Sequence, residues 1–234
     1  MKRLSPMMQP SRLSLIVLSL ASLIAASTSS GLALLIGISS WLVLLISSAV
    51  ISLLRPWLRK EASLARADST LTLCFIALLV ASVVSLLSLV IQVSRYEAMT
   101  LAGIWLPLIA SNGLIYMHLV SAWDASAKVL LCSAWVRGAQ FTVVMLLLAL
   151  VRELLGTGSI LTNMHVFFST FSASGIIVIS NYPRLKLFAL PTGGLLVLGL
   201  SLALIQWMQL RRLVVAKTVL PSEEKRVRVT GRIS

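Results

Sequence analysis

Charged side chains are scarce in this chain: only 12% of its 234 residues are charged, and seven of these are acidic. Hydrophobic residues make up 58% of the sequence, and the mean hydropathy is +0.98. A soluble globular domain carries roughly 25% charged residues. The lack of charge and the long apolar runs therefore exclude a soluble domain and predict an all-α integral membrane protein.

Residues that carry out chemistry are also few. The two cysteines, Cys74 and Cys132, lie within or beside apolar stretches. This pattern implies no disulfide framework and favours two small buried side chains. We find no nucleophile with a neighbouring base, no phosphate-binding loop, no paired carboxylates and no cluster of metal ligands. We therefore assign no catalytic residue and no metal site, and an independent enzyme is not expected.

Basic residues give a net charge of +13, but they are dispersed between apolar spans instead of forming one face. This dispersion argues against nucleic acid as a partner and points to the lipid bilayer. Basic residues of the tail, such as Arg211 and Arg212, would face anionic lipid or fix the topology.

Six membrane-spanning segments are predicted, after a cytoplasmic N-terminus of residues 1–12. The first apolar stretch, 13–26, is only a half-span, since crossing the hydrocarbon takes about 20 residues. Its basic start resembles a signal peptide, but we expect it to be retained because another span follows at once. The remaining spans are 31–54, 69–94, a broken segment at about 98–123, 129–151 with Arg137 near its membrane entry, and 187–210. Residues 211–234 form a basic, mobile cytoplasmic tail.

The distribution of positive charge sets the orientation. With six spans, sixteen of the 20 Lys and Arg residues fall on the side of both termini. The positive-inside rule then places both termini in the cytoplasm. Residues 160–180 are apolar enough for a seventh span, but that topology would almost abolish the charge bias. We expect this stretch to be interfacial or re-entrant.

Two of the spans are interrupted by polar residues. Pro107 is followed by Ser111, Asn112 and Gly113 inside a run that lacks charge from residue 98 to 123. Residues 23–27 echo residues 108–112 and also run into a polar stretch, so Ser22 and Ser27 mark a first break. Interrupted segments at matching places in two halves point to inverted three-helix repeats, here about 13–95 and 98–210. We expect the two breaks to meet at the membrane midplane.

Three pieces of sequence carry a resemblance to a known family. They are Leu106–Ile109 with Ser111 and Asn112, the run Arg-Glu-Leu-Leu-Gly-Thr-Gly at 152–158, and Leu190–Pro191 with Gly193 and Gly194. In order and spacing they resemble the six-span membrane subunits of the Rnf and Nqr ion-translocating oxidoreductases, above all the E-type Rnf and D-type Nqr subunits. The similarity runs from about residue 18 to residue 210.

This resemblance implies a location in the inner membrane of a bacterium, a partner and a cofactor. The partner is a homologous, oppositely oriented subunit of the A-type in Rnf or the E-type in Nqr, within a larger complex. The cofactor is one [2Fe-2S] cluster held between the two, with two cysteines from each subunit at its helix breaks. Here Gly113 and Ala21 occupy the cysteine positions. Because neither can ligate iron, this chain is expected to supply no cofactor ligands of its own.

Few other residues could replace the missing cysteines. Cys74 and Cys132 lie near the cytoplasmic ends of their spans, away from the breaks. His118 follows Gly113 by five positions. It is either a cluster ligand or proton relay, or a histidine without a functional role that is hydrogen-bonded within the protein or lies at the interface. His165 falls in the outer connection. The Arg152–Glu153 pair is expected to act as an interfacial anchor.

Three functions remain open for this chain. The first is an electron-transfer subunit of an Rnf-like complex. The second is a scaffold subunit of that family that holds no cluster, and the third is a stand-alone transporter of ions or small solutes. Gly37 and several serines between 39 and 52 permit close helix packing, which suits a scaffold. No acidic residue lies beside either break, which disfavours the transporter. We favour membership in such a complex with the local iron-sulfur ligands lost.

Overall fold

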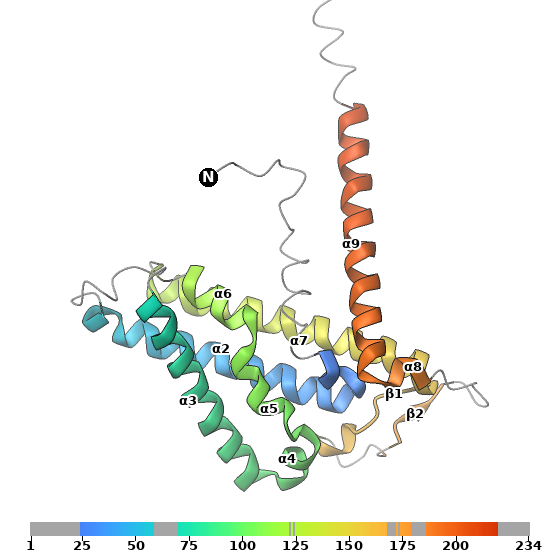
Figure 1. Ribbon diagram of the computed structural model, residues 1–234, viewed down its shortest axis with the longest axis horizontal. Helices are drawn as coiled ribbons and strands as arrows, with labels where there is room; N and C mark the ends of the chain where they lie inside the picture. The colour runs from blue at the N-terminus through green and yellow to red at the C-terminus, as the bar shows by residue number, and fades with distance from the viewer. Residues whose placement is uncertain are drawn as a thin grey trace, which may run out of the picture.

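The computed structural model describes residues 24–58, 70–121, 123, 125–167, 172, 174–178 and 186–219 (Figure 1). The predicted half-span up to residue 23, with Ala21 and Ser22, lies outside the described residues. The described part is almost entirely helical, which confirms the predicted helical membrane protein.

The elements follow one another along the chain as a series of helices with one short strand pair. In order they are η3 (Ile24–Thr28), α2 (Ser30–Leu58), α3 (Thr70–Ser94), α4 (Tyr96–Ala102), α5 (Trp105–Leu108), η4 (Ile109–Ser111), α6 (Gly113–Ser121), α7 (Ala127–Thr157), β1 (Ser159–Ile160), η5 (Met164–Val166), β2 (Ile176–Ile177), α8 (Lys186–Ala189) and α9 (Pro191–Val219).

Three of these helices are long and apolar enough to cross a membrane. They are α2, α3 and α7, and a fourth span forms if α4 and residues 105–121 are taken together as a pair bent by 66°. These helices correspond to the predicted spans 31–54, 69–94, 129–151 and 98–123. The arrangement as six spans in two inverted repeats stays a prediction.

Helices α2 and α7 form the centre of the fold, and Figure 1 shows them side by side. Gly37 of α2 faces Thr142 of α7, and Trp41 faces Gly138, so the two helices run antiparallel. A Cβ on Gly37 would lie only 2.9 Å from Thr142 Cγ2, so the absence of a side chain permits the close approach. Of the apolar window of α2, 56% is buried, against 22% for α3, which makes α2 the central span.

Two helices extend beyond the predicted spans. Helix α2 continues through Leu58, so Arg55 lies in its last turn. There it donates hydrogen bonds to the carbonyls of Trp123 and Ala125, which joins the end of α2 to the start of α7. Helix α9 continues to Val219, so residues 211–219 of the predicted mobile tail are helical. Its sequence stays mostly apolar through residues 213–216, which explains the extension.

The connection after α7 contains a small strand pair. Ser159 of β1 pairs with Ile177 of β2 in an antiparallel register, and η5 lies between the two strands. Within the described residues of 160–180, no helix is long enough to span the membrane. After this connection, α9 begins beside α7 and then projects away from the α2–α7 pair (Figure 1).

Candidate functional site

The first break in the helices is at Ser27, where the backbone leaves the helical region with φ −82° and ψ 25°. Ser27 is buried, although its side chain is polar. Helix α2 begins three residues later, and the Ser29 hydroxyl accepts a hydrogen bond from the Leu32 amide at 3.3 Å. The polar residues after the half-span therefore cap the start of α2.

Arg152, in the last turns of α7, connects this break to the entry of the last helix. Its Nη1 donates to Ser27 Oγ at 2.7 Å, its Nε to the Phe188 carbonyl at 3.2 Å and its Nη2 to the Leu190 carbonyl at 2.9 Å. Only 2% of the Arg152 side chain is exposed. A buried guanidinium needs acceptors, and the freed carbonyls at the α8–α9 junction provide them.

Glu153, the next residue, serves the start of α2. Its Oε1 accepts hydrogen bonds from the Ser30 amide at 2.5 Å and from the Thr162 hydroxyl. The Gly31 amide donates to the Thr162 carbonyl at 3.0 Å. A carboxylate at a helix N-terminus is favourable because the unpaired amides and the helix dipole give that end a partial positive charge.

Burial of both side chains corrects the expectation that Arg152 and Glu153 form an interfacial anchor. Both are almost fully enclosed, and they point toward different partners: Arg152 toward η3 and α8–α9, and Glu153 toward α2 and Thr162. One signal of this role was available in the sequence, since charged residues within an apolar helix generally face the protein interior. We call these two residues with Ser27 and Ser30 the α7 junction.

The second break is at Asn112. Its backbone is extended, with φ −68° and ψ 110°, between η4 and α6. Its side-chain Oδ1 accepts a hydrogen bond from the Leu114 amide at 3.1 Å, so Asn112 caps α6. Ser111 Oγ donates to the Leu108 carbonyl at 2.8 Å, and Pro107 lies within α5.

Another bend occurs earlier in the chain, at a place where no break was predicted. Helix α4 and residues 105–121 meet at 66°. Gly103 at this corner has φ +46°, a conformation that other residues rarely adopt. The glycine was the available signal, but a single glycine is a weaker indication of a break than the proline and the Ser-Asn-Gly run that follow it.

Gly113, the first residue of α6, lies at the surface of the chain. A Cβ built on it meets no heavy atom within 4 Å among the described residues. Ser111, on the same stretch, is also exposed, whereas Asn112 between them is fully buried. A side chain at position 113 would thus point out of the chain, toward lipid or a neighbouring protein.

The two cysteines, which are the other candidate metal ligands, do not lie at either break. Cys74 on α3 and Cys132 on α7 are both exposed, so the expectation that they are buried was wrong. A thiol is only weakly polar, and an apolar bilayer tolerates it on the outer surface of a helix. Within the described ranges, no three His, Cys, Asp or Glu side chains come together as a metal-ligand group.

His118 lies in α6 and is fully buried. Neither ring nitrogen makes a hydrogen bond of normal geometry with a described residue, although the ring lies near the Leu130 backbone and Arg137 on α7. His165 lies in η5 and is partly buried. The two histidines therefore belong to separate parts of the fold.

The two breaks have different neighbours. The first, in η3, packs against α2, α7 and α9, whereas η4 packs against α2, α3 and α5. They share α2, which runs past both. Their meeting at a common midplane site stays a prediction, because Ser22 lies outside the described part of the chain.

Comparisons with known proteins cover nearly the whole chain. The family described as Rnf-Nqr subunit, membrane protein, matches residues 4–202. The E subunit of the ion-translocating oxidoreductase complex of Cellvibrio japonicus is 31% identical over 225 residues, covering 93% of this chain and 90% of that protein. The protein of the same name from Pseudomonas aeruginosa UCBPP-PA14 is 32% identical over 222 residues, covering 92% and 89%. That of Thioalkalivibrio sulfidiphilus is 29% identical over 191 residues, covering 80% and 79%.

Proposed function

The chain belongs to the Rnf-Nqr family of membrane subunits, and from this premise we propose that it is the E-type membrane component of an ion-translocating oxidoreductase complex. The observation that carries this proposal is the similarity to the E-type relatives over about nine-tenths of both chains. The long apolar helices suit a protein that is embedded in the bilayer.

The proposed setting is the bacterial cytoplasmic membrane, with both termini in the cytoplasm and a homologous, oppositely oriented subunit as the partner. The exposed edge at Ser111 and Gly113 supports this pairing, because it presents a helix break at the surface of the chain. Non-helical backbone at membrane depth needs cover by protein or water. A second subunit would supply that cover.

The residues present do not fit the [2Fe-2S] cluster of the family. Such clusters are held by thiolates, with histidine in some cases. Position 113 has open space for a side chain, but glycine offers no donor atom, and Ala21 offers none either. Cys74 and Cys132 lie on α3 and α7 and face outward. We therefore propose that the chain acts as a structural subunit and carries no electrons itself.

The α7 junction suits a structural role. Arg152 and Glu153 of α7 form hydrogen bonds with three parts of the fold. These are the first break, the start of α2 and the entry of α9. Buried charge-assisted hydrogen bonds of this kind fix helix positions in an apolar solvent. The chain would thereby present a fixed surface to its partners.

The test begins with co-purification. A tagged full chain, extracted from its native membrane in mild detergent, is expected to bring down the other subunits of the complex. Iron and acid-labile sulfide are then measured on the isolated pair formed with the homologous subunit, and both are expected to be near zero. The double variant Ala21→Cys with Gly113→Cys is expected to raise the iron content, whereas Gly113→Ala serves as the matched control.

Two results would contradict the proposal. Stoichiometric iron with a [2Fe-2S] spectrum in the unmodified pair would make the chain an electron-transfer subunit. A chain that purifies without partners and transports an ion or solute in liposomes would instead be a stand-alone transporter.

A further inference from the structure

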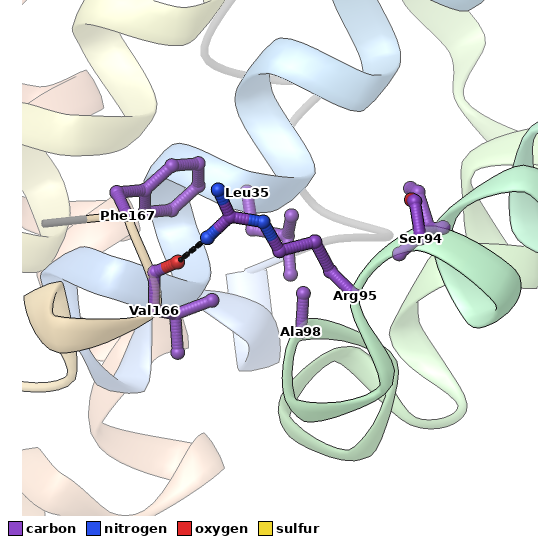
Figure 2. Close-up of a pocket in the computed structure, with 7 residues that line it drawn as sticks. Leu35, Ser94, Arg95, Ala98, Val166 and Phe167 are labelled. Carbon is purple, nitrogen blue, oxygen red and sulfur yellow. Dashed lines mark hydrogen bonds between the residues drawn. The ribbon is translucent and has the colours of Figure 1, made fainter. Parts of the chain in front are cut away.

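A pocket of about 220 Å³ opens where four segments of the fold meet (Figure 2). These are the early part of α2, the end of α3, the start of α4 and the turn that follows η5. The residues lining it are Leu35, Ile91, Ser94, Arg95, Ala98, Val166 and Phe167. The pocket is separate from the α7 junction and from the break at Asn112.

The position of the pocket along the spans places it near one membrane face. Leu35 lies in the second turn of α2, and Ser94 is the last residue of α3. The start of one span and the end of the next thus frame the opening. Phospholipid headgroups begin where such spans end.

Arg95 provides the polar part of the site. It stands between α3 and α4, and its Nη1 donates to the Val166 carbonyl at 3.0 Å. Figure 2 shows the side chain extending across the pocket toward Val166 and Phe167. A guanidinium has five N–H donors. This single bond to a described residue leaves donors for a ligand, and no acidic residue lines the pocket.

The remaining lining is mainly apolar, with Leu35, Ile91, Val166 and Phe167 contributing side chains. Pockets that enclose a whole small ligand measure roughly 300–1,000 Å³. A smaller, open hollow suits one part of a ligand, while the rest of that ligand stays in the bilayer. Arginine is well matched to phosphate oxygens, which it can bind through two parallel hydrogen bonds.

We propose that this pocket binds the phosphate of an anionic membrane phospholipid, with Arg95 contacting the phosphate and the apolar wall contacting the first part of an acyl chain. Bound there, the lipid bridges α2, α3, α4 and the η5 turn. This inference is independent of the proposed place of the chain in an oxidoreductase complex.

The test uses the purified full chain in a neutral detergent. Its thermal unfolding is followed with added phosphatidylglycerol, phosphatidylcholine or inorganic phosphate. Because a ligand that binds only the folded state stabilises it, phosphatidylglycerol is expected to raise the melting temperature in a concentration-dependent manner. The other two are expected to have little effect. Mass spectrometry of the lipid retained through purification is expected to show enrichment of phosphatidylglycerol over its share of the membrane.

Single-residue variants then test whether phosphatidylglycerol binds at this pocket. Arg95→Gln is expected to weaken the apparent affinity for phosphatidylglycerol about tenfold, as expected for loss of a charge-assisted hydrogen bond. Ala98→Leu keeps the arginine but fills the pocket and is expected to weaken binding as well. Lys128→Gln is the control, because it removes the same charge from an exposed site at the start of α7. It should leave the apparent affinity for phosphatidylglycerol unchanged.

Several outcomes would overturn the proposal. Equal stabilisation by inorganic phosphate would make this a site for free anions, and equal stabilisation by phosphatidylcholine would show that the charge of the lipid is not recognised. Unchanged lipid binding in folded Arg95→Gln protein would show that Arg95 only holds the η5 turn. Unchanged lipid binding in folded Ala98→Leu protein would show that the lipid does not enter the pocket. Retained lipid without enrichment of phosphatidylglycerol would also refute the site.

Discussion

Arg152 Nη1 lies 2.7 Å from Ser27 Oγ, although 125 residues separate the two in sequence. The same guanidinium also donates to carbonyls at 188 and 190. One side chain near the end of α7 thus holds the first helix break and the entry of the last helix. We therefore expect the stability of this end of the protein to depend on Arg152.

Replacement of Arg152 by alanine is expected to destabilise the protein by about 2–4 kcal/mol, because it leaves buried acceptors without donors. Arg152→Lys should recover only part of this loss, since an ammonium group cannot reproduce the three-way geometry of the guanidinium. Thermal unfolding of the full chain in detergent measures both effects. Lys128→Ala, at an exposed position, is the control, and equal stability of Arg152→Ala and wild type would refute the prediction.

Substitutions of Glu153 are expected to lower the stability of the fold by different amounts. Glu153→Gln keeps an acceptor for the Ser30 amide but loses the charge at the start of α2, which costs about 0.3–1 kcal/mol. Glu153→Ala should cost more, because the Ser30 amide and the Thr162 hydroxyl both lose their acceptor. The two variants are compared in the same unfolding assay. A larger loss of stability in Glu153→Gln than in Glu153→Ala would be inconsistent with Glu153 as the acceptor for these two donors.

Close contact between α2 and α7 leads to a prediction about Gly138. A Cβ added there would overlap the ring of Trp41, which itself packs against Trp135 with ring centroids 4.6 Å apart. Gly138→Ala is therefore expected to cost about 1–3 kcal/mol through overpacking. Gly199→Ala is the matched control, because a Cβ at Gly199 meets nothing within 4 Å among the described residues. This control should be neutral or slightly stabilising in unfolding measurements, since alanine favours helix.

The distribution of basic residues predicts the orientation in the membrane. A green fluorescent protein fused after Ser234 is expected to fluoresce, because it folds in the cytoplasm. Alkaline phosphatase inserted at the exposed Ser174 is expected to be active, because that connection would lie on the outer side. The reciprocal fusions at the same two positions should be silent. Activity of both reporters at one position would argue against the six-span topology.

Much of the fold followed from hydrophobic length. The spans at 31–54, 69–94 and 129–151 were predicted because a helix that crosses a bilayer needs about 20 apolar residues, and the structure forms α2, α3 and α7 there. Helix ends were predicted less well. Arg55 and residues 211–219 are helical because local charge alone does not end a helix.

Lateral contacts were the weaker part of the prediction. The exposed faces of Cys74 and Cys132 could not be derived from composition, since lipid is as apolar as a protein core and outward-facing residues look like buried ones. The bend at Gly103 was missed because a single glycine is a weak signal beside a proline.

By itself the sequence determined that the chain lies in a membrane, where its main spans run, and that positions 21 and 113 lack thiols, because each of these depends only on residue type and on distance along the chain. Only the tertiary structure decided that Arg152 and Glu153 are buried and that Gly113 faces outward. These properties depend on which helices lie side by side, and that is set by contacts between residues more than a hundred positions apart.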